Sequence, residues 1–362
     1  MKNILLIGGT GVIGCALQQV LIHSNDYTVH ITSRNKSHKD FNNIKFHIGD
    51  SLCFNFIKGV IKSENFDAIV DFMVYSTNHF KKSIDFYLNN CGHYIFLSSY
   101  RVYSDSKGIL TEKSLRLIDD IRIDSNYRKS EEYAIKKAKQ ENIIFSHANE
   151  NWTILRPSIT FGPNRLQLFC FEASLFLPRI NNNLAIIVPK NIRNIKTTYT
   201  DSDVAALYIF NIINNPLSYS EVFNLCSDSV YCWDDIFQFY SKEFKAQFIE
   251  VDHNIFKTLY VNQYQVEYDR MLNRQMSNLK IKNVIIKNIR ESDLFEKLKI
   301  YAKKSSFKVY SGGRINGRMD KILDHNKIGL INSNKEKLKY IIGFNSILNT
   351  TYGFIKKNKY LK

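Results

Sequence analysis

The chain has 362 residues, 44% of them hydrophobic, and a net charge of +16 at pH 7. This length suits one large α/β domain with a smaller partner, burying most of the apolar surface. No stretch approaches the roughly 18 uninterrupted apolar residues of a spanning helix, which excludes a transmembrane segment. The six cysteines are scattered without a Cys-x-x-Cys pair, which excludes a disulfide framework and a metal site. We therefore expect reduced thiols and a cytoplasmic location.

The positive charge is concentrated in the last third of the chain. Residues 251–362 carry 23 Lys and Arg against 9 Asp and Glu, a net +14. Such a region is a candidate surface for nucleic acid or an anionic membrane. The lysines are dispersed and no RNA-binding motif accompanies them, which favours an ordinary solvated surface. Nucleic acid is therefore a disfavoured partner, although the charge alone does not exclude one.

The first predicted element is a buried strand that ends in glycines three residues apart. It lies in Ile4-Leu-Leu-Ile-Gly-Gly-Thr-Gly-Val-Ile-Gly14, and a helix-compatible stretch follows to Ile22. The apolar run is too short for a secretory leader. The first glycine permits the turn, the second admits a pyrophosphate and the third lets the helix pack on the strand. Free N–H groups at the helix start then bind phosphate. The predicted cofactor-binding residues here are Gly8, Thr10, Gly11, Val12, Ile13 and Gly14.

Strands and helices alternate along the next 150 residues. We predict strands at 27–32, 44–48, 66–73, 93–97 and 152–156, with helices over 53–62 and about 130–145. Such alternation predicts a doubly wound parallel sheet, a Rossmann fold, with ligands outside the carboxyl ends of the strands.

The pattern becomes irregular beyond about Gly162. We therefore predict a nucleotide-binding domain over residues 1–163, with further strands and helices contributed from about 195–230. A smaller substrate-binding lobe with a basic extension then occupies residues 164–362. The last sixty residues, including Ser311-Gly-Gly-Arg-Ile-Asn-Gly317, fit no element that the sequence predicts.

Several motifs in the right order resemble those of the short-chain dehydrogenase/reductase superfamily. The Gly-x-x-Gly-x-x-Gly spacing resembles its extended branch, the nucleotide-sugar epimerases and dehydratases. Phe96-Leu-Ser-Ser-Tyr-Arg-Val-Tyr103 is similar to the family's Ser-Ser-x-x-Val-Tyr signature, which implies that Ser99 is the catalytic serine. Residues 152–163 resemble Leu-Arg-Pro…Tyr-Gly-Pro, which closes a strand beside the nicotinamide at Pro157. Residues 200–205 and 222–225 match two later segments.

The resemblance implies further contacts with a nicotinamide dinucleotide. The second strand ends in Thr32-Ser33-Arg34 without the acidic residue of an NAD site, and a hydroxyl and a guanidinium can instead hold a 2′-phosphate. The cofactor is therefore NAD or NADP, and we favour NADP. The family's Gly-Asp pair implies that Asp50 and Ser51 meet the adenine. Phe72 and Met73 replace a smaller Leu-Ala pair along the ribose and pyrophosphate.

Two tyrosines compete for the catalytic position. A tyrosinate is needed near neutral pH, and a lysine one helical turn later stabilises the anion. Tyr127 is followed at that spacing by Glu131, which disfavours the anion. Tyr133 is followed by Lys137 and then Glu141, as in the family's Tyr-x-x-x-Lys-x-x-x-Glu helix. We therefore predict that Tyr133 and Lys137 act with Ser99.

The resemblance implies an epimerase, a dehydratase or a 4-keto reductase acting on a nucleotide-activated sugar. Tyr133 would exchange a proton with the sugar C4 hydroxyl while a hydride passes between C4 and the nicotinamide. A dehydratase needs a carboxylate pair after the serine, and Tyr100 and Arg101 stand there, so dehydration is the least favoured. The alternative is a non-catalytic or RNA-associated relative that keeps the fold. Relatives commonly form homodimers through their helices. The sequence names neither the sugar nor the nucleotide.

Overall fold

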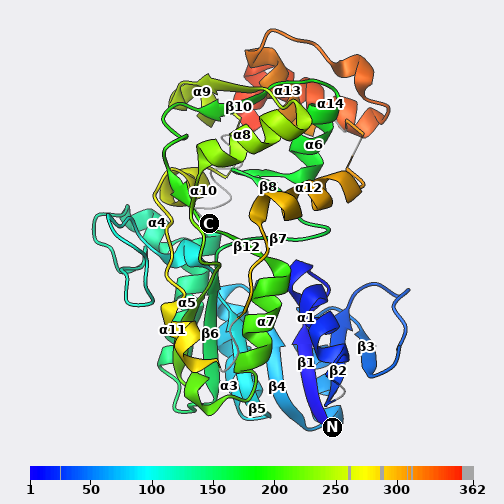
Figure 1. Cartoon of the computed structure of the whole chain (residues 1–362), viewed down its shortest axis with the longest axis vertical. Coiled ribbons are helices and arrows are strands. Elements are labelled where there is room, and N and C mark those ends of the chain that lie inside the picture. Colours follow the sequence, from blue (N-terminus) through cyan, green and yellow to red (C-terminus); the bar gives the residue numbers. More distant parts are fainter. Residues whose placement is uncertain (25, 260–261, 286–288, 308, 311–312, 353–362) are drawn as a thin grey trace.

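The computed structural model describes residues 1–24, 26–259, 262–285, 289–307, 309–310 and 313–352. The chain forms two parts, a sheet flanked by helices and a smaller lobe rich in helices (Figure 1). The N-terminus lies at the far end of the sheet, away from the lobe. No helix within these described ranges is both long and apolar enough to cross a membrane.

The larger part is built on a seven-stranded sheet in which neighbouring strands are all parallel. Its spatial order is β13 (Glu221–Leu225), β6 (Trp152–Pro157), β5 (Cys91–Leu97), β4 (Phe66–Asp71), β1 (Lys2–Ile7), β2 (Tyr27–Ser33) and β3 (Ile44–Ile48). The chain winds outward from β1 in both directions, so the order reverses between β1 and β4. Doubly wound sheets bind ligands at such a point. The predicted Rossmann architecture is confirmed.

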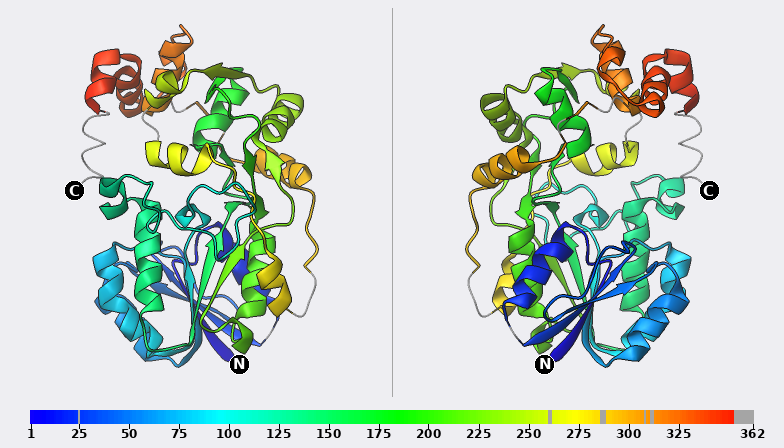
Figure 2. Two further views of the ribbon diagram at one scale, coloured as in Figure 1. Left: turned by 90° about the vertical axis from the view of Figure 1, so that its left-hand side faces the viewer. Right: turned by 90° about the vertical axis from the view of Figure 1, so that its right-hand side faces the viewer.

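Successive residues of β1 face opposite layers of helices, as the two-residue period of a strand requires. Ile4 and Leu6 belong to the apolar core under α1 (Val12–Ile22) and α7 (Ser202–Ile212). Leu5 and Ile7 belong to the core on the other face. That face is covered by α2 (Phe54–Ser63), α3 (Thr77–Leu88) and α5 (Tyr133–Phe145) (Figure 2). Because both faces of β1 are covered, it reads as a continuous apolar run.

Several predicted elements differ from the observed ones by one to three residues at an end, and two of these differences have a visible cause. The strand predicted over 66–73 ends at Asp71, because the Asp71 carboxylate accepts a hydrogen bond from the Met73 N–H at 2.9 Å and turns the chain. The helix predicted from Ser130 begins at Tyr133. Glu132 caps it, since its carboxylate accepts the Ala134 N–H at 2.8 Å. This cap fixes which residues of α5 face the carboxyl ends of the strands.

The lobe contains short strand pairs and helices around a separate apolar core. The strands are β7 (Ile159–Phe161), β8 (Gln167–Leu168), β9 (Phe171–Glu172), β10 (Ile186–Pro189), β11 (Lys196–Thr197), β12 (Tyr199–Asp201), β14 (Tyr231–Cys232) and β15 (Phe248–Val251). The helices of the lobe include α6 (Ala173–Asn181), α8 (Trp233–Phe244), α9 (His253–Lys257), α10 (Gln263–Gln265) and α12 (Leu294–Lys304). By contrast, α11 (Leu279–Val284) packs on the sheet, where its Ile281 belongs to the same apolar core as Ile4 and Leu6. A short π-helix, η3 (Val266–Arg270), follows α10 directly. The boundary predicted at residues 163 and 164 stays a prediction.

The segment without a predicted element contains two helices packed closely together. They are α13 (Gly313–Ile322) and α14 (Asn334–Phe344). A Cβ on Gly317 would lie 2.1 Å from the Tyr340 carbonyl oxygen, and one on Gly343 would lie 1.8 Å from that of Arg314. Glycine at both positions therefore allows the two backbones to approach, although glycine lowers the helix propensity by which such a segment is recognised.

Candidate active site

The glycine turn after β1 has the geometry that its three glycines predict. Gly8 has φ of +69°, in the left-handed region that favours glycine. A Cβ on Gly14 would lie 2.2 Å from the Gly9 carbonyl oxygen, so the third glycine allows the helix to pack against the turn. Gly11, by contrast, faces open space within 4 Å. The space that a second glycine keeps free is therefore present.

The start of α1 also fits a phosphate group. Gly11 is its N-cap and no side chain caps it, and the first turn carries no acidic residue. The orphan N–H groups and the positive end of the helix dipole are thus available to an anion. With the open space over Gly11, this cradle fits the pyrophosphate of a dinucleotide.

A cavity of about 440 Å³ lies between the carboxyl ends of the strands and the lobe. Its lining includes many of the predicted site residues: Gly8, Gly11, Val12, Ile13, Gly14, Phe72, Ser99, Tyr133, Lys137 and Pro157. Segments that are up to 149 residues apart in sequence thus meet at one place. The structure brings the predicted catalytic trio and the glycine turn together.

The other predicted cofactor residues lie outside the lining of this cavity. Thr10, Arg34 and Asp50 are exposed. The Ser33 hydroxyl bonds the Asn35 N–H at 3.0 Å and the His38 ring at 2.9 Å. Ser51 donates to the Thr32 hydroxyl at 2.7 Å, and that hydroxyl accepts the Gly8 N–H at 2.8 Å. Met73 packs against Gly8. Their contacts with a cofactor stay predictions.

Lys137 is fixed at the inner wall of the cavity by backbone carbonyls. Its Nζ donates to the carbonyl oxygens of Met73 at 2.9 Å and Leu97 at 2.7 Å. The Phe96 ring centroid lies 4.3 Å from the same atom. Burial lowers the pKa of Lys137 to about 7, although the Asp71 carboxylate acts in the opposite direction. The ammonium is therefore held in place, and its charge is sensitive to pH in the neutral range.

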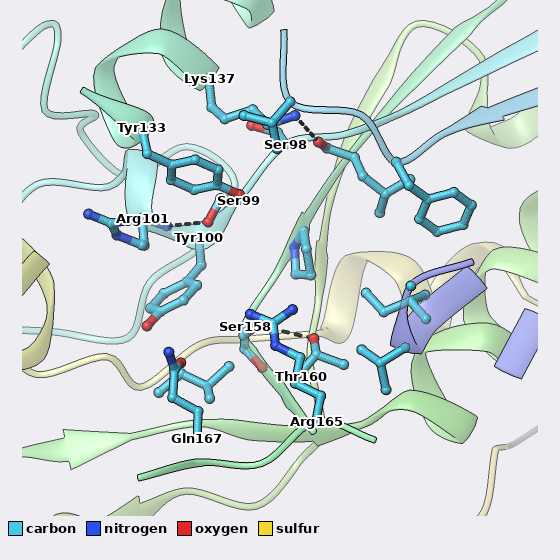
Figure 3. A pocket seen from close by; sticks show the side chains of 18 of the residues that line it. Ser98, Ser99, Tyr100, Arg101, Tyr133, Lys137, Ser158, Thr160, Arg165 and Gln167 are labelled. Carbon is cyan, nitrogen blue, oxygen red and sulfur yellow. Dashed lines mark hydrogen bonds between the residues drawn. The ribbon is translucent and has the colours of Figure 1, made fainter. Parts of the chain in front are cut away.

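Ser99 and Tyr133 come from different elements and point toward each other in the cavity (Figure 3). Ser99 follows β5 and caps η1 (Tyr100–Val102), where its Oγ accepts the Arg101 N–H at 3.2 Å. The serine proton is therefore left for an acceptor in the cavity. Tyr133 is the first residue of α5, one turn before Lys137. Two hydroxyl groups and one ammonium thus line the same space.

The structure places the competing tyrosine elsewhere. Tyr127 is only 1% exposed, and its hydroxyl donates to Glu132 at 3.0 Å. Its ring is stacked on Tyr264 and Tyr268. Burial raises the pKa of Tyr127, and the Glu132 charge adds to this effect. Tyr127 is not among the residues that line the cavity, so the geometry favours Tyr133.

Glu141 is the last residue of the predicted Tyr-Lys-Glu spacing. It lies beneath the cavity and bonds residues of neighbouring elements. It is fully buried and accepts both Arg156 Nε at 2.9 Å and Arg156 Nη2 at 2.7 Å. The Ser98 hydroxyl donates to the same carboxylate at 2.6 Å. Burial raises the pKa of Glu141, but the Arg156 charge and hydrogen bonds outweigh it, so the pKa is lowered. The pair therefore ties α5 to β6 and to the end of β5.

The sequence did not predict the wall that faces the catalytic trio. It is formed by η1, by the segment 165–172 with the short strands β8 and β9, and by the ends of α10 and the π-helix, namely Tyr100, Arg101, Arg165, Gln167, Glu172, Gln265 and Arg270. From the sequence, Tyr100 and Arg101 indicated only that the carboxylate pair of a dehydratase does not follow Ser99. Arg270 donates to the Phe169 carbonyl oxygen at 2.9 Å and to Gln167 at 2.7 Å, across 101 and 103 residues. A local motif does not report contacts over such separations.

Known proteins resemble the chain in sequence and in fold. The model of the NAD dependent epimerase/dehydratase family matches residues 4–210. No curated protein matches the sequence significantly.

Three solved structures illustrate the similarity of fold. A dTDP-glucose 4,6-dehydratase from Bacillus anthracis in complex with NAD is 17% identical with a TM-score of 0.63, over 84% of this chain and 96% of that one. A UDP-glucose 4-epimerase from Thermotoga maritima with UDP-glucose is 16% identical with a TM-score of 0.60, over 84% and 98%. A Thermus thermophilus UDP-glucose 4-epimerase with NAD is 12% identical with a TM-score of 0.61, over 84% and 98%.

Proposed function

The chain belongs to the NAD dependent epimerase/dehydratase family, and from that premise we propose that it is an epimerase or 4-keto reductase acting on a nucleotide-activated sugar. The observation that carries the proposal is the meeting of Ser99, Tyr133 and Lys137 in one cavity with the open glycine turn. This arrangement has the parts that hydride transfer at a sugar carbon needs. They are a cradle for the dinucleotide and a proton-transfer group at the reacting oxygen.

The proposed roles follow from where each group lies. Tyr133 takes the proton from the sugar C4 hydroxyl during oxidation, or returns it during reduction, at its phenolic oxygen. Ser99 donates a hydrogen bond to the same sugar oxygen, because its own Oγ already accepts from the Arg101 N–H. Lys137 supplies positive charge one helical turn from Tyr133. When bound, the nicotinamide accepts or donates the hydride.

The residues after Ser99 disfavour dehydration as the reaction. Tyr100 is buried, and its hydroxyl donates to Asp269 at 3.0 Å. The Arg101 guanidinium donates to Glu132 at 3.0 Å. Elimination of water from a 4-keto sugar requires a base at the carbon next to C4 and an acid at the hydroxyl of the following carbon, and neither of these side chains supplies a carboxylate for these roles. We therefore propose epimerisation or ketone reduction in preference to dehydration.

The cofactor preference is the finer part of the proposal. We propose that NADP binds better than NAD, since Arg34 is exposed beside the end of β2 and the segment Thr32–Arg34 has no acidic residue. A guanidinium makes charge-assisted bonds with phosphate.

A panel of sugar nucleotides tests the function directly. UDP-, GDP-, dTDP- and CDP-sugars are incubated with the protein and with NAD or NADP(H), and the sugars are analysed by NMR. We expect inversion or reduction at C4 with at least one nucleotide class. The Tyr133→Phe variant serves as the inactive control. A protein that turns over no member of the panel, yet retains RNA in a salt-dependent manner, would support the RNA-associated alternative and contradict the proposal.

A further inference from the structure

Arg101 occupies an unusual place beside the predicted catalytic tyrosine. Its guanidinium carbon lies 5.1 Å from the centroid of the Tyr133 ring, and the residue lines the cavity. Figure 3 shows Arg101 on the same side of the cavity as Tyr133 and Ser99. Arg101 is nevertheless only 8% exposed. A buried guanidinium is costly unless its positive charge is neutralised by nearby groups. The neighbours of Arg101 therefore decide whether its charge is balanced.

The buried groups around Arg101 do not balance its charge. Its Nη2 lies 3.0 Å from Glu132, and its Nε lies 3.6 Å from Asp269. Asp269 also pairs with Arg270, and with Arg274 at 3.3 Å. All five side chains are buried. Three guanidinium groups therefore share two carboxylates, and the cluster keeps one positive charge in excess.

An excess buried charge is costly unless an anion completes the site. Arg101 has the free capacity for such an anion. Its Nε is buried without a hydrogen-bond partner but faces the Asp269 carboxylate at 3.6 Å, so the donor left for a ligand is Nη1. Over the described ranges, its Nη1 forms no hydrogen bond, whereas Arg270 is fully engaged with the Phe169 carbonyl, Gln167 and Tyr100. The unfilled donors of the cluster thus belong to the residue that touches Tyr133.

The position of Arg101 indicates which part of a ligand carries the anion. The phosphate cradle at Gly11 belongs to α1, and the turn that contains Gly162 packs on α1, where a Cβ on Gly162 would lie 2.4 Å from Val12. Arg165 closes that turn, pairing with Gly162 through the backbone, and lines the cavity. Arg165 thus lies on the side of the cradle, whereas Arg101 lies across the cavity from Arg165, beside Tyr133 and Ser99 (Figure 3). In the proposed reaction the reacting sugar carbon lies at Tyr133, so Arg101 is the cation at the sugar end of the cavity.

We propose that the sugar itself carries a carboxylate, so that the substrate is a nucleotide-activated acidic sugar such as a uronic acid. This inference rests on the proposed function and adds the class of sugar to it. The carboxylate meets the Arg101 guanidinium while Tyr133 and Ser99 bind the C4 oxygen. Arg101 is then a specificity-determining residue, and the anion neutralises the excess charge of the cluster.

Matched pairs of sugar nucleotides test the inference through binding. UDP-glucose is compared with UDP-glucuronic acid, and UDP-galactose with UDP-galacturonic acid, by calorimetric titration of the protein with its dinucleotide bound. We expect the acidic member to bind at least about tenfold more tightly, the effect of one charge-assisted bond. Equal or weaker binding of the acidic member in both pairs would overturn the inference while leaving the proposed function standing. Failure of all four to bind, together with failure of the GDP, dTDP and CDP forms of the same sugars, would overturn both.

Two variants locate the preference. Arg101→Gln should reduce the ratio of affinities within a pair to about one, and Arg101→Lys, which keeps a cation, should restore part of it. Arg165→Gln is the matched control at the other end of the cavity, and it should weaken both members equally and preserve the ratio. A ratio that survives Arg101→Gln would overturn the role of Arg101. If that variant does not fold, the ratios in Arg101→Lys and the wild type decide the question.

Discussion

Both parts of the molecule have an apolar core, but their elements are joined in different ways. The sheet is built from strands such as β1 and β4, whose apolar side chains pack under helices on both faces. Over the residues that the structure describes, the strands of the lobe form two-stranded sheets, and a buried ion pair connects two of its helices. Arg179 and Asp320 are both fully buried and meet at 2.8 Å, although they are 141 residues apart in sequence. The comparison shows that local sequence patterns specify the sheet, whereas individual contacts between residues far apart in sequence specify the lobe.

The largest effect is expected at Tyr133, the proposed proton-transfer group, which lies on helix α5 of the larger part. Tyr133→Phe removes the phenolic proton, so turnover should fall by about 10²–10⁴-fold, the usual contribution of general acid–base catalysis, with dinucleotide affinity retained. Tyr127→Phe is the control, since its hydroxyl only bonds Glu132, and it should be mild. Steady-state rates and cofactor titrations check both. A reversed pattern would show that Tyr127 is the catalytic tyrosine.

The lobe should be most vulnerable at its buried pair. Asp320→Ala leaves Arg179 buried without a counter-charge and also removes the acceptor of the Tyr310 and Tyr340 hydroxyls. We expect a loss of about 3–5 kcal/mol in the free energy of unfolding, measured by denaturant titration.

The surface pair of Lys190 with Asp252, whose side chains are 55% and 64% exposed, provides the control for this loss. Asp252→Ala should cost less than about 1 kcal/mol. If the two variants are equally stable, the lobe is not held by its buried charges.

The open space over Gly11 gives the next effect. Gly11→Val places a branched side chain where the pyrophosphate enters, so cofactor affinity should fall about a hundredfold or more. Gly59→Val is the control, because Gly59 also faces open space but lies on α2 outside the cavity. Fluorescence titration with the dinucleotide measures both. Unchanged affinity in Gly11→Val would count against the whole assignment of the cofactor cradle.

Lys137 should make stability depend on pH in a stated direction. Its pKa is lowered to about 7 by burial, so between pH 7 and the ordinary lysine pKa the unfolded chain binds a proton that the folded chain lacks. The free energy of unfolding should therefore rise with pH across this range, by at most about 1.4 kcal/mol per unit. Denaturant titrations at pH 6 to 9 should show that Lys137→Met loses this slope and Lys136→Met keeps it. The same slope in Lys137→Met would show that another group titrates.

The smallest effect concerns the exposed edge of the cofactor site. NADP(H) should bind about tenfold more tightly than NAD(H), because the charged bond to a 2′-phosphate is partly screened by solvent. Arg34→Ala should remove most of the difference, and Lys36→Ala on the same loop should not. Calorimetric titration of both cofactors decides this. Tighter binding of NAD would refute the 2′-phosphate site and leave the catalytic trio untouched.

The difference between the two parts also explains what could be predicted from the sequence. Strands such as β1 and β6 are recognisable because their apolar residues are consecutive, and the glycine turn is recognisable because its constraints lie within seven residues. Tyr133 and Lys137 are recognisable because they lie one helical turn apart, so the pattern depends on no distant residue. Each of these features is a local consequence of backbone geometry.

The lobe could not be predicted in the same way. Arg270 and Asp269 are neighbours in sequence, but their partners include Tyr100 on η1 and Gln167 on β8. Gly317 and Gly343 indicate flexibility when taken alone, whereas here they allow α13 and α14 to meet. The wall of the cavity that faces the predicted catalytic trio is therefore assembled from contacts that appear only in three dimensions.

The central claim is that Tyr133, Ser99 and Lys137 carry out hydride transfer between a nucleotide-activated sugar and a bound nicotinamide. The most direct measurement is a single-turnover experiment that follows nicotinamide absorbance after the protein, loaded with oxidised or reduced cofactor, is mixed with each sugar nucleotide or its 4-keto form. We predict a change in the redox state of the cofactor with at least one sugar in the wild type, and none in Tyr133→Phe. A cofactor whose redox state does not change with any sugar, or changes equally in both proteins, would contradict the claim.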